Sequence, residues 1–112
     1  MYLLYHNPRC SKSRDCLKIV KNKKVDIKEK LYLKDGLSNV ELNKIINSLL
    51  NPISDLVRTN EKQFKSKPFD LNSKKLVISF LHKNPICLQR PLFFNGKNYI
   101  ICRPPETVLN YI

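Results

Sequence analysis

The N-terminal part of the chain has the pattern of a strand, a helix and a second strand. Residues 2–5 are apolar and aromatic, which predicts a short buried strand that Asn7-Pro8 closes. A helix is predicted from Ser11 or Ser13, because apolar residues then recur at helical spacing: Cys16, Leu17, Ile19 and Val20. Residues 25–33 alternate well enough to predict a second strand, which ends before Gly36.

The middle of the chain has the spacing of several short helices. Ser38 followed by Glu41 is a capping box, and it opens an amphipathic helix. Residues 53–67 predict short helical turns around a few apolar side chains. Ser73 then caps a further helix, which Pro85 terminates.

The C-terminal part predicts a β-hairpin over residues 91–101 and a final helix. The hairpin is indicated by two apolar runs on either side of Asn95-Gly96, a dipeptide typical of hairpin turns. The helix is predicted to begin at Pro104-Pro105, because proline suits a first helical turn. This order of elements indicates an α/β fold, a thioredoxin-like mixed sheet flanked by helices. We expect a single domain over residues 1–112, with a helical insertion at about 37–85.

The formal net charge is +12, from 21 lysines and arginines against 9 acidic residues. Such a charge often indicates a nucleic-acid partner. Here the lysines are dispersed along the whole chain without an aromatic recognition motif, so we expect no specific nucleic-acid binding. No stretch approaches the roughly 20 apolar residues of a membrane span, and no charged leader precedes residues 2–5. We therefore expect a cytoplasmic protein with no membrane partner, and we further expect a monomer.

The cysteines at positions 10, 16, 87 and 102 lack the paired C-x2-C spacing of structural zinc sites. We therefore expect no metal, and in the cytoplasm we expect free thiols rather than disulfides. Cys16 stands six helical residues after Cys10. Because six helical residues place Cys16 about 240° round the helix and roughly 9 Å along its axis, Cys16 is too far from Cys10 for a bridge and is interpreted as a core residue.

Cys10 is the candidate nucleophile. It follows a predicted strand and precedes a helix, so its sulfur should face free backbone N–H groups at the positive end of the helix dipole. We expect positive charge from Arg9, Lys12 and Arg14, with His6 a further candidate, to lower the pKa of this thiol below its free value of about 8.5. A cysteine phosphatase loop, C-x5-R, is excluded by Cys16, and a C-x2-C dithiol is excluded by Ser13.

Three arginines stand alone at predicted element boundaries: Arg58, Arg90 and Arg103. A guanidinium presents a planar fork of donors that matches the oxygens of an oxyanion. If the three converge on one activated thiol they form an anion pocket, whereas each taken alone is equally well an ordinary surface cation. Arg90 also precedes Pro91 at the start of a strand, where a thioredoxin-like fold carries its cis-proline.

Several separated motifs together resemble the glutaredoxin-dependent arsenate reductase family: His6-Asn7-Pro8-Arg9-Cys10-Ser11-Lys12-Ser13-Arg14, Leu31-Tyr32-Leu33, Arg90-Pro91 and Arg103-Pro104-Pro105-Glu106. The resemblance implies a thioredoxin-like fold with Cys10 as nucleophile. It implies Arg58, Arg90 and Arg103 as oxyanion ligands, with His6 and Ser13 as modulators of the thiolate. It also implies arsenate as substrate, glutathione as co-substrate, glutaredoxin as partner and no bound cofactor.

The implied mechanism begins with attack of Cys10 on arsenate to form a thiol–arsenate ester. Glutathione then displaces this ester to a mixed disulfide as arsenite leaves, and glutaredoxin resolves the disulfide. Because resolution is external, we expect the other cysteines to be dispensable for chemistry: Cys16, Cys87 and Cys102.

Two alternatives remain open from the sequence. The first is an orphan thiol reductase acting on glutathione mixed disulfides, with arsenate only an incidental substrate. The second is a redox-regulatory adaptor of the related branch that binds RNA polymerase and uses C-x2-C as a switch. Ser13 argues against that switch, and a pocket holding all three arginines would favour arsenate over the orphan reductase.

Overall fold

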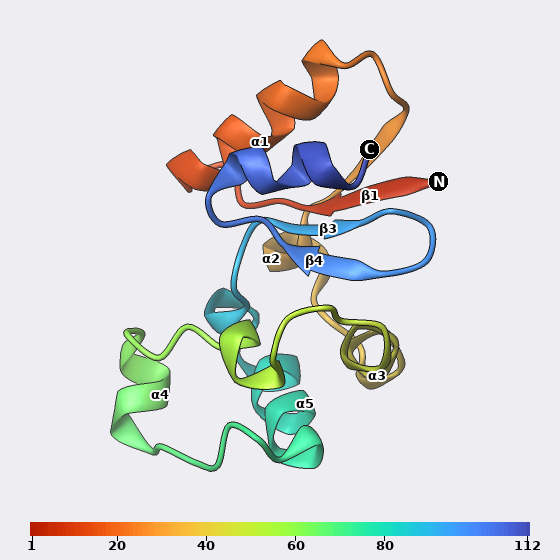
Figure 1. Cartoon of the computed structure of the whole chain (residues 1–112). Helices are drawn as coiled ribbons and strands as arrows, with labels where there is room; N and C mark the ends of the chain where they lie inside the picture. Colours follow the sequence, from red (N-terminus) through yellow and green to blue (C-terminus); the bar gives the residue numbers. More distant parts are fainter.

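Four short strands form one mixed sheet, described by a computed structural model that covers residues 1–112 (Figure 1). The strand order is β2-β1-β3-β4. Strands β1 and β2 are parallel, whereas β3 is antiparallel to both β1 and β4. The elements in chain order are β1 (Tyr2–Tyr5), α1 (Ser11–Asn22), β2 (Ile27–Lys30), α2 (Tyr32–Asp35), α3 (Asn39–Asn47), η1 (Ile53–Leu56), α4 (Lys62–Ser66), α5 (Lys74–Lys83), η2 (Pro85–Cys87), β3 (Leu92–Phe94), β4 (Tyr99–Ile101) and η3 (Pro105–Asn110).

The sheet separates two apolar cores. Because successive side chains of a strand point to opposite faces, Leu4 and Phe93 pack with α1 and η3, while the neighbouring Tyr5 and Leu92 pack on the other face. Figure 1 shows α1 and η3 side by side over the first face. The predicted thioredoxin-like α/β fold is therefore confirmed, with helices on both faces of a mixed sheet.

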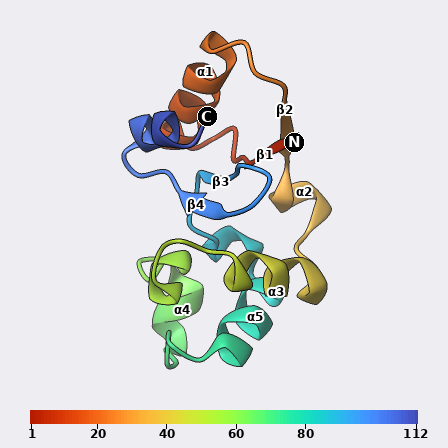
Figure 2. The same ribbon diagram turned by 45° about the vertical axis from the view of Figure 1, so that its right-hand side comes forward.

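The helical insertion lies between β2 and β3 in the chain and comprises α3, η1, α4, α5 and η2. Figure 2 shows α3, α4 and α5 gathered on the side of the sheet away from α1. One short antiparallel bridge, Val57 to Leu88, joins the insertion to the segment before β3. The Arg58 N–H donates to the Cys87 carbonyl at 2.8 Å, and the Gln89 N–H donates to the Leu56 carbonyl at 2.8 Å. This bridge fixes Arg58 close to the start of β3.

The second strand is shorter than the alternation over residues 25–33 predicted, and the prediction is wrong at both ends, for residues 25–26 and 31–33. Only Ile27–Lys30 is a strand, because β1 offers four residues for pairing. After Lys30 the chain turns into α2, which buries Tyr32 completely and leaves Leu33 exposed. Gly36 closes this turn with a φ of 76°, a left-handed conformation that favours glycine.

Half of the predicted capping box forms at α3. The Ser38 hydroxyl accepts a hydrogen bond from the Glu41 N–H at 3.1 Å. The Glu41 carboxylate turns instead toward the sheet, where it accepts from the Tyr5 hydroxyl at 2.7 Å and forms an ion pair with Lys30. One carboxylate thus ties the insertion to β1 and β2.

None of the helices combines the length and the apolar character that crossing a membrane requires.

Removing the contacts of the Glu41 carboxylate with Tyr5 and Lys30 is expected to destabilise the fold. Glu41→Ala leaves the Tyr5 hydroxyl and the Lys30 ammonium without their acceptor, which should cost about 1–3 kcal/mol of unfolding free energy. Urea denaturation measures this cost. The matched control is Glu106→Ala, which removes an exposed carboxylate and should change stability by less than about 0.5 kcal/mol. Equal stability of the two variants would contradict the structural role of Glu41.

Candidate active site

The topology brings four chain segments to one edge of the sheet. Strands β1 and β2 are parallel, so the segments that follow them emerge at the same edge. Strand β3 is antiparallel to β1 and begins at this edge, and β4 ends there. Cys10 follows β1, Arg90 precedes β3 and Arg103 follows β4, so all three meet although they are distant in sequence. The peptide bonds before Pro91 and Pro104 are both cis.

Backbone hydrogen bonds hold the loop that carries Cys10. The Asn7 side-chain oxygen accepts from the Arg9 N–H at 3.0 Å, and the Asn7 carbonyl accepts from the Cys10 N–H at 3.0 Å. Cys10 is the N-cap residue of α1, and its carbonyl accepts from the Arg14 N–H. The thiol is therefore half-buried at the positive end of a helix of 12 residues.

The surroundings of Cys10 favour its thiolate. Burial alone raises the pKa of the Cys10 thiol, but the N–H groups of Ser13 and Lys12 and the Arg90 guanidinium outweigh burial, so the pKa lies below its ordinary value. Arg103 Nη2 also donates to Sγ at 3.9 Å. A thiol that ionises easily at an accessible position is suited to nucleophilic attack.

The sequence motif predicted that the neighbours of Cys10 would supply positive charge to its thiol. In the structure this charge comes from elsewhere in the chain. Arg14 is exposed and donates to the Pro8 carbonyl at 3.0 Å, and the Arg9 side chain is also exposed. Lys12 acts through its backbone N–H. The positive charge is supplied by Arg90 and Arg103, from the far end of the chain.

His6 and Ser13 form a buried pair beneath the loop. Ser13 Oγ accepts from the Asn7 N–H at 3.0 Å and lies 2.7 Å from His6 Nδ1. Burial lowers the pKa of His6, and the charges of Lys21 and Arg14 lower it further against the opposing effect of Glu29. The lowered pKa favours a neutral imidazole, so His6 adds no positive charge at Cys10. The pair instead ties the loop to α1.

Arg90 and Arg103 lie beside the thiol, and Arg58 is close enough to both that its charge lowers the pKa of Arg103; different partners hold the three side chains. Arg103 Nε donates to the Arg90 carbonyl at 2.8 Å, and Arg90 Nη1 donates to the Ile86 carbonyl at 2.9 Å. Arg58 Nη1 donates to Gln89 Oε1 at 3.0 Å, and its Nε lies 3.7 Å from a Glu61 carboxylate oxygen. Burial lowers the pKa of Arg103, and repulsion from Arg58 and Arg90 lowers it further, while the Cys10 thiolate opposes both.

Three buried side-chain donor atoms at this edge have no hydrogen-bond partner: Tyr32 Oη, Arg58 Nε and Arg90 Nε. Arg58 Nε faces the Glu61 carboxylate at 3.7 Å, whereas Tyr32 Oη and Arg90 Nε have no acceptor. Buried polar groups are nearly always hydrogen-bonded, so these two donors are suited to the oxygens of an anion bound at Cys10. The sequence did not single out the Tyr32 hydroxyl, because residues 31–33 were assigned to a strand. The only signal for this residue was its place in the Leu31-Tyr32-Leu33 motif.

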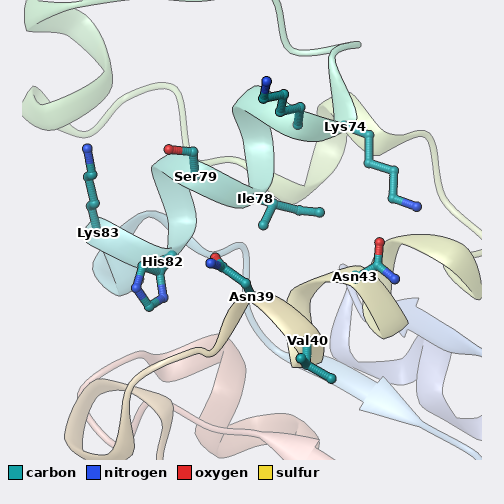
Figure 3. Close-up of a pocket in the computed structure, with 9 residues that line it drawn as sticks. Asn39, Val40, Asn43, Lys74, Ile78, Ser79, His82 and Lys83 are labelled. Atoms are coloured by element: carbon teal, nitrogen blue, oxygen red, sulfur yellow. The ribbon is translucent and has the colours of Figure 1, made fainter.

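Cavity size alone does not identify the site. The largest cavity, about 880 Å³, lies between α3 and α5 and is lined by lysines, asparagines and His82, with no thiol (Figure 3). Two smaller cavities flank the arginines. One of about 480 Å³ includes Gln89 and Arg103, and the other, of about 610 Å³, includes His6 and Arg90. No three histidine, cysteine or carboxylate side chains gather as metal ligands.

The other cysteines are fully buried: Cys16, Cys87 and Cys102. A hydrogen bond to the Cys16 thiol and burial both raise the pKa of Cys102. Burial, with a contribution from Glu61, raises the pKa of Cys87 against the effect of Arg58 and Arg90. Cys10 is the one thiol that solvent reaches.

The Cys10 environment predicts an early titration. The ultraviolet absorbance of the thiolate, at about 240 nm, should rise as the pH rises, with an inflection below the ordinary thiol pKa of about 8.5. Below that inflection the thiol is protonated, so alkylation by iodoacetamide should slow as the pH falls through it. Cys10→Ser should lose this inflection, because the remaining thiols are buried. An inflection in the parent at or above that of a free thiol would contradict the stabilised thiolate.

Comparison with known proteins identifies the family. An arsenate reductase of Haemophilus influenzae is 34% identical over 114 residues, covering 98% of this chain and 97% of that protein. The uncharacterized protein YfgD of Escherichia coli K12 is 33% identical over 116 residues, covering 97% of this chain and 94% of that protein. The solved structure of an arsenate reductase from Vibrio cholerae superposes with a TM-score of 0.88 at 27% identity, covering 99% of this chain and 97% of that one. Residues 5–111 match the sequence model of the ArsC family, and the chain therefore belongs to this family.

Proposed function

We propose that this protein reduces arsenate to arsenite, with Cys10 as the nucleophile, glutathione as co-substrate and glutaredoxin as the protein that regenerates the thiol. Family membership and similarity to arsenate reductases over nearly the whole chain support an arsenate-reductase-like oxidoreductase. The observation that carries the proposal is one half-buried thiol of lowered pKa that interacts with the guanidiniums of Arg90 and Arg103, with Arg58 close enough to lower the pKa of Arg103.

Charge explains why the substrate would be an oxyanion. Arsenate is negatively charged at neutral pH, and it cannot approach a thiolate unless nearby cations offset the repulsion. Arg58, Arg90 and Arg103 supply three positive charges, and their forked donors also fix the orientation of a tetrahedral anion. The disulfide bond that the orphan thiol reductase would attack carries no charge, so guanidiniums placed at the Cys10 sulfur itself favour an oxyanion substrate over a mixed disulfide.

In the first proposed step, Cys10 Sγ attacks arsenic(V). A sulfur–arsenic bond forms while the bond from arsenic to one arsenate hydroxyl breaks, and that hydroxyl takes up a proton from solvent and leaves as water. The guanidiniums stay bound to the remaining oxygens and stabilise the negative charge that builds up during the attack. Cys10 is only half-buried, so arsenate can reach it from solvent.

In the second proposed step, the thiolate of glutathione attacks Cys10 Sγ. A disulfide forms, the sulfur–arsenic bond breaks, and its electron pair remains on arsenic, which leaves as arsenite in the +3 state. The two sulfur atoms supply the two electrons that arsenic gains. A glutaredoxin thiol then attacks the mixed disulfide and releases the Cys10 thiolate.

The resolving thiol is proposed to be external because no thiol of this chain is suitably exposed. Cys16, Cys87 and Cys102 are fully buried, and Ser13 occupies the position of the second cysteine in a C-x2-C motif. The Ser13 hydroxyl is already engaged with His6 and Asn7. We propose that this buried pair modulates the thiolate by holding the loop, so that the N–H groups of residues 12 and 13 point at Sγ. The dependence on glutathione also favours a cytoplasmic location.

Single-turnover reduction tests the proposal. With arsenate, glutathione and glutaredoxin, the parent should form arsenite, and Cys10→Ser should form none. The variant Cys16→Ala/Cys87→Ala/Cys102→Ala should retain most of the parent's activity; alanine is chosen because a serine hydroxyl would need a new partner in the core. Loss of turnover in a folded triple variant would instead indicate an internal thiol relay. A parent that forms no arsenite would refute the proposed function.

Lysine substitutions test the anion site. Arg58→Lys, Arg90→Lys and Arg103→Lys keep the charge but lose the fork, so each should cost about 1–3 kcal/mol of transition-state stabilisation. That cost corresponds to a fall in arsenate turnover of roughly five- to 150-fold. The control is Arg9→Lys, whose exposed side chain has no partner in the site, and its turnover should match the parent. Parent-like turnover in all three site variants would exclude an arginine-based oxyanion site.

A further inference from the structure

Tyr32 has a buried hydroxyl whose proton no protein group accepts, since the nearby Arg90 guanidinium can only donate to it. Its side chain is 0% exposed, and its Oη is one of the three buried polar side-chain atoms without a hydrogen-bond partner. The other two belong to Arg58 and Arg90, which lie in the arginine cluster at Cys10. An unpaired buried hydroxyl is costly to a fold, and phenylalanine would fill the same space without that cost.

Topology places Tyr32 directly behind the Cys10 loop. Strand β2 ends at Lys30, whose carbonyl accepts from the His6 N–H at 2.9 Å, so α2 begins where this loop begins. The residues on either side, Leu31 and Leu33, line the same cavity as His6 and Arg90. Tyr32 therefore lies at the same edge of the sheet as the thiol, and its hydroxyl is close enough to Cys10 and Arg90 for their charges to shift its pKa.

The electrostatics of Tyr32 agree with this position. The pKa of Tyr32 is raised to about 12, chiefly by burial and in part by the charge of the Cys10 thiolate, while Arg90 and Arg58 oppose the increase. Tyr32 in turn contributes a small increase to the pKa of Arg103. The hydroxyl therefore interacts electrostatically with Cys10 and with all three arginines. It keeps its proton throughout the neutral pH range.

We propose that Tyr32 is a fourth, uncharged ligand of the oxyanion, donating its O–H to an oxygen of arsenate bound at Cys10. This inference rests on the proposed function and adds a substrate-contacting residue to it. The three guanidiniums already repel one another, as the lowered pKa of Arg103 indicates. A neutral donor adds a hydrogen bond to the anion without adding to that repulsion, and the bound anion satisfies a hydroxyl that is otherwise unpaired.

The test compares Tyr32→Phe with Tyr99→Phe. Tyr99 belongs to the same core cluster but stands at the opposite end of β4 from Arg103, and its hydroxyl interacts with Tyr5. Cys10 is alkylated with neutral iodoacetamide at increasing concentrations of arsenate, or of phosphate as a tetrahedral anion that is not reduced. The anion concentration that halves the alkylation rate measures binding without turnover.

Tyr32→Phe should require an about tenfold higher concentration of arsenate or phosphate for half-protection, as expected for one lost hydrogen bond to an anion. Its alkylation rate without anion should stay within about twofold of the parent, and its thermal midpoint should be unchanged or higher, because the removed hydroxyl has no partner. Tyr99→Phe should keep the parent's half-protection. Loss of anion binding without loss of stability is a combination that a merely structural tyrosine would not give.

Two results would overturn the inference: unchanged half-protection in Tyr32→Phe, or a lower thermal midpoint, which would reveal a protein partner for the hydroxyl. Either result leaves the proposed function intact if the parent reduces arsenate. Conversely, a parent that forms no arsenite but loses phosphate protection on Tyr32→Phe would refute the proposed function and support Tyr32 as an anion ligand.

Discussion

The site depends on stabilising one negative charge in a half-buried position. Burial alone raises the pKa of Cys10, and the protein reverses this effect with backbone N–H groups of α1 and with the guanidinium of Arg90. The first N–H groups of a helix have no partner within the helix, so those of α1 are free to donate to the Cys10 sulfur. The arginines supply charge, and because they outnumber the thiolate they leave a net positive site. A positive site of this kind is ready for a second anion, which is the basis of the proposed arsenate chemistry.

The sheet topology is what makes this arrangement possible in a chain of this length. One edge collects the ends of β1, β2 and β4 and the start of β3, and each of these ends supplies a group of the site. Arg58 is the exception, because it comes from the helical insertion. The bridge between Val57 and Leu88 brings it in, and Glu41 holds the insertion against the sheet from the other side. The insertion therefore serves the site as well as the core.

Unpaired donors give the site a different character from the rest of the protein. Elsewhere the buried side-chain polar atoms have partners, and only at this edge are three of them left without one. A folded protein keeps such costly groups where a ligand can satisfy them. The proposed role of Tyr32 follows from this contrast. It also implies that removing the Tyr32 hydroxyl weakens anion binding without lowering the stability of the fold.

The sequence by itself determined the local features: the strands, most of the helices, the hairpin, and Cys10 at the start of a helix. These follow from spacing and capping, which act over a few residues. It also indicated which arginines to consider, from their isolated positions and from the family resemblance, although their roles remain proposals. Tertiary structure alone decided that β2 stops at Lys30, since a strand extends only as far as its partner does. It likewise decided that Glu41 faces Tyr5, that Arg90 rather than Arg9 or Arg14 supplies charge to Cys10, and that the hydroxyl of Tyr32 is unpaired. Each of these depends on contacts between residues far apart in the chain, which no local pattern encodes.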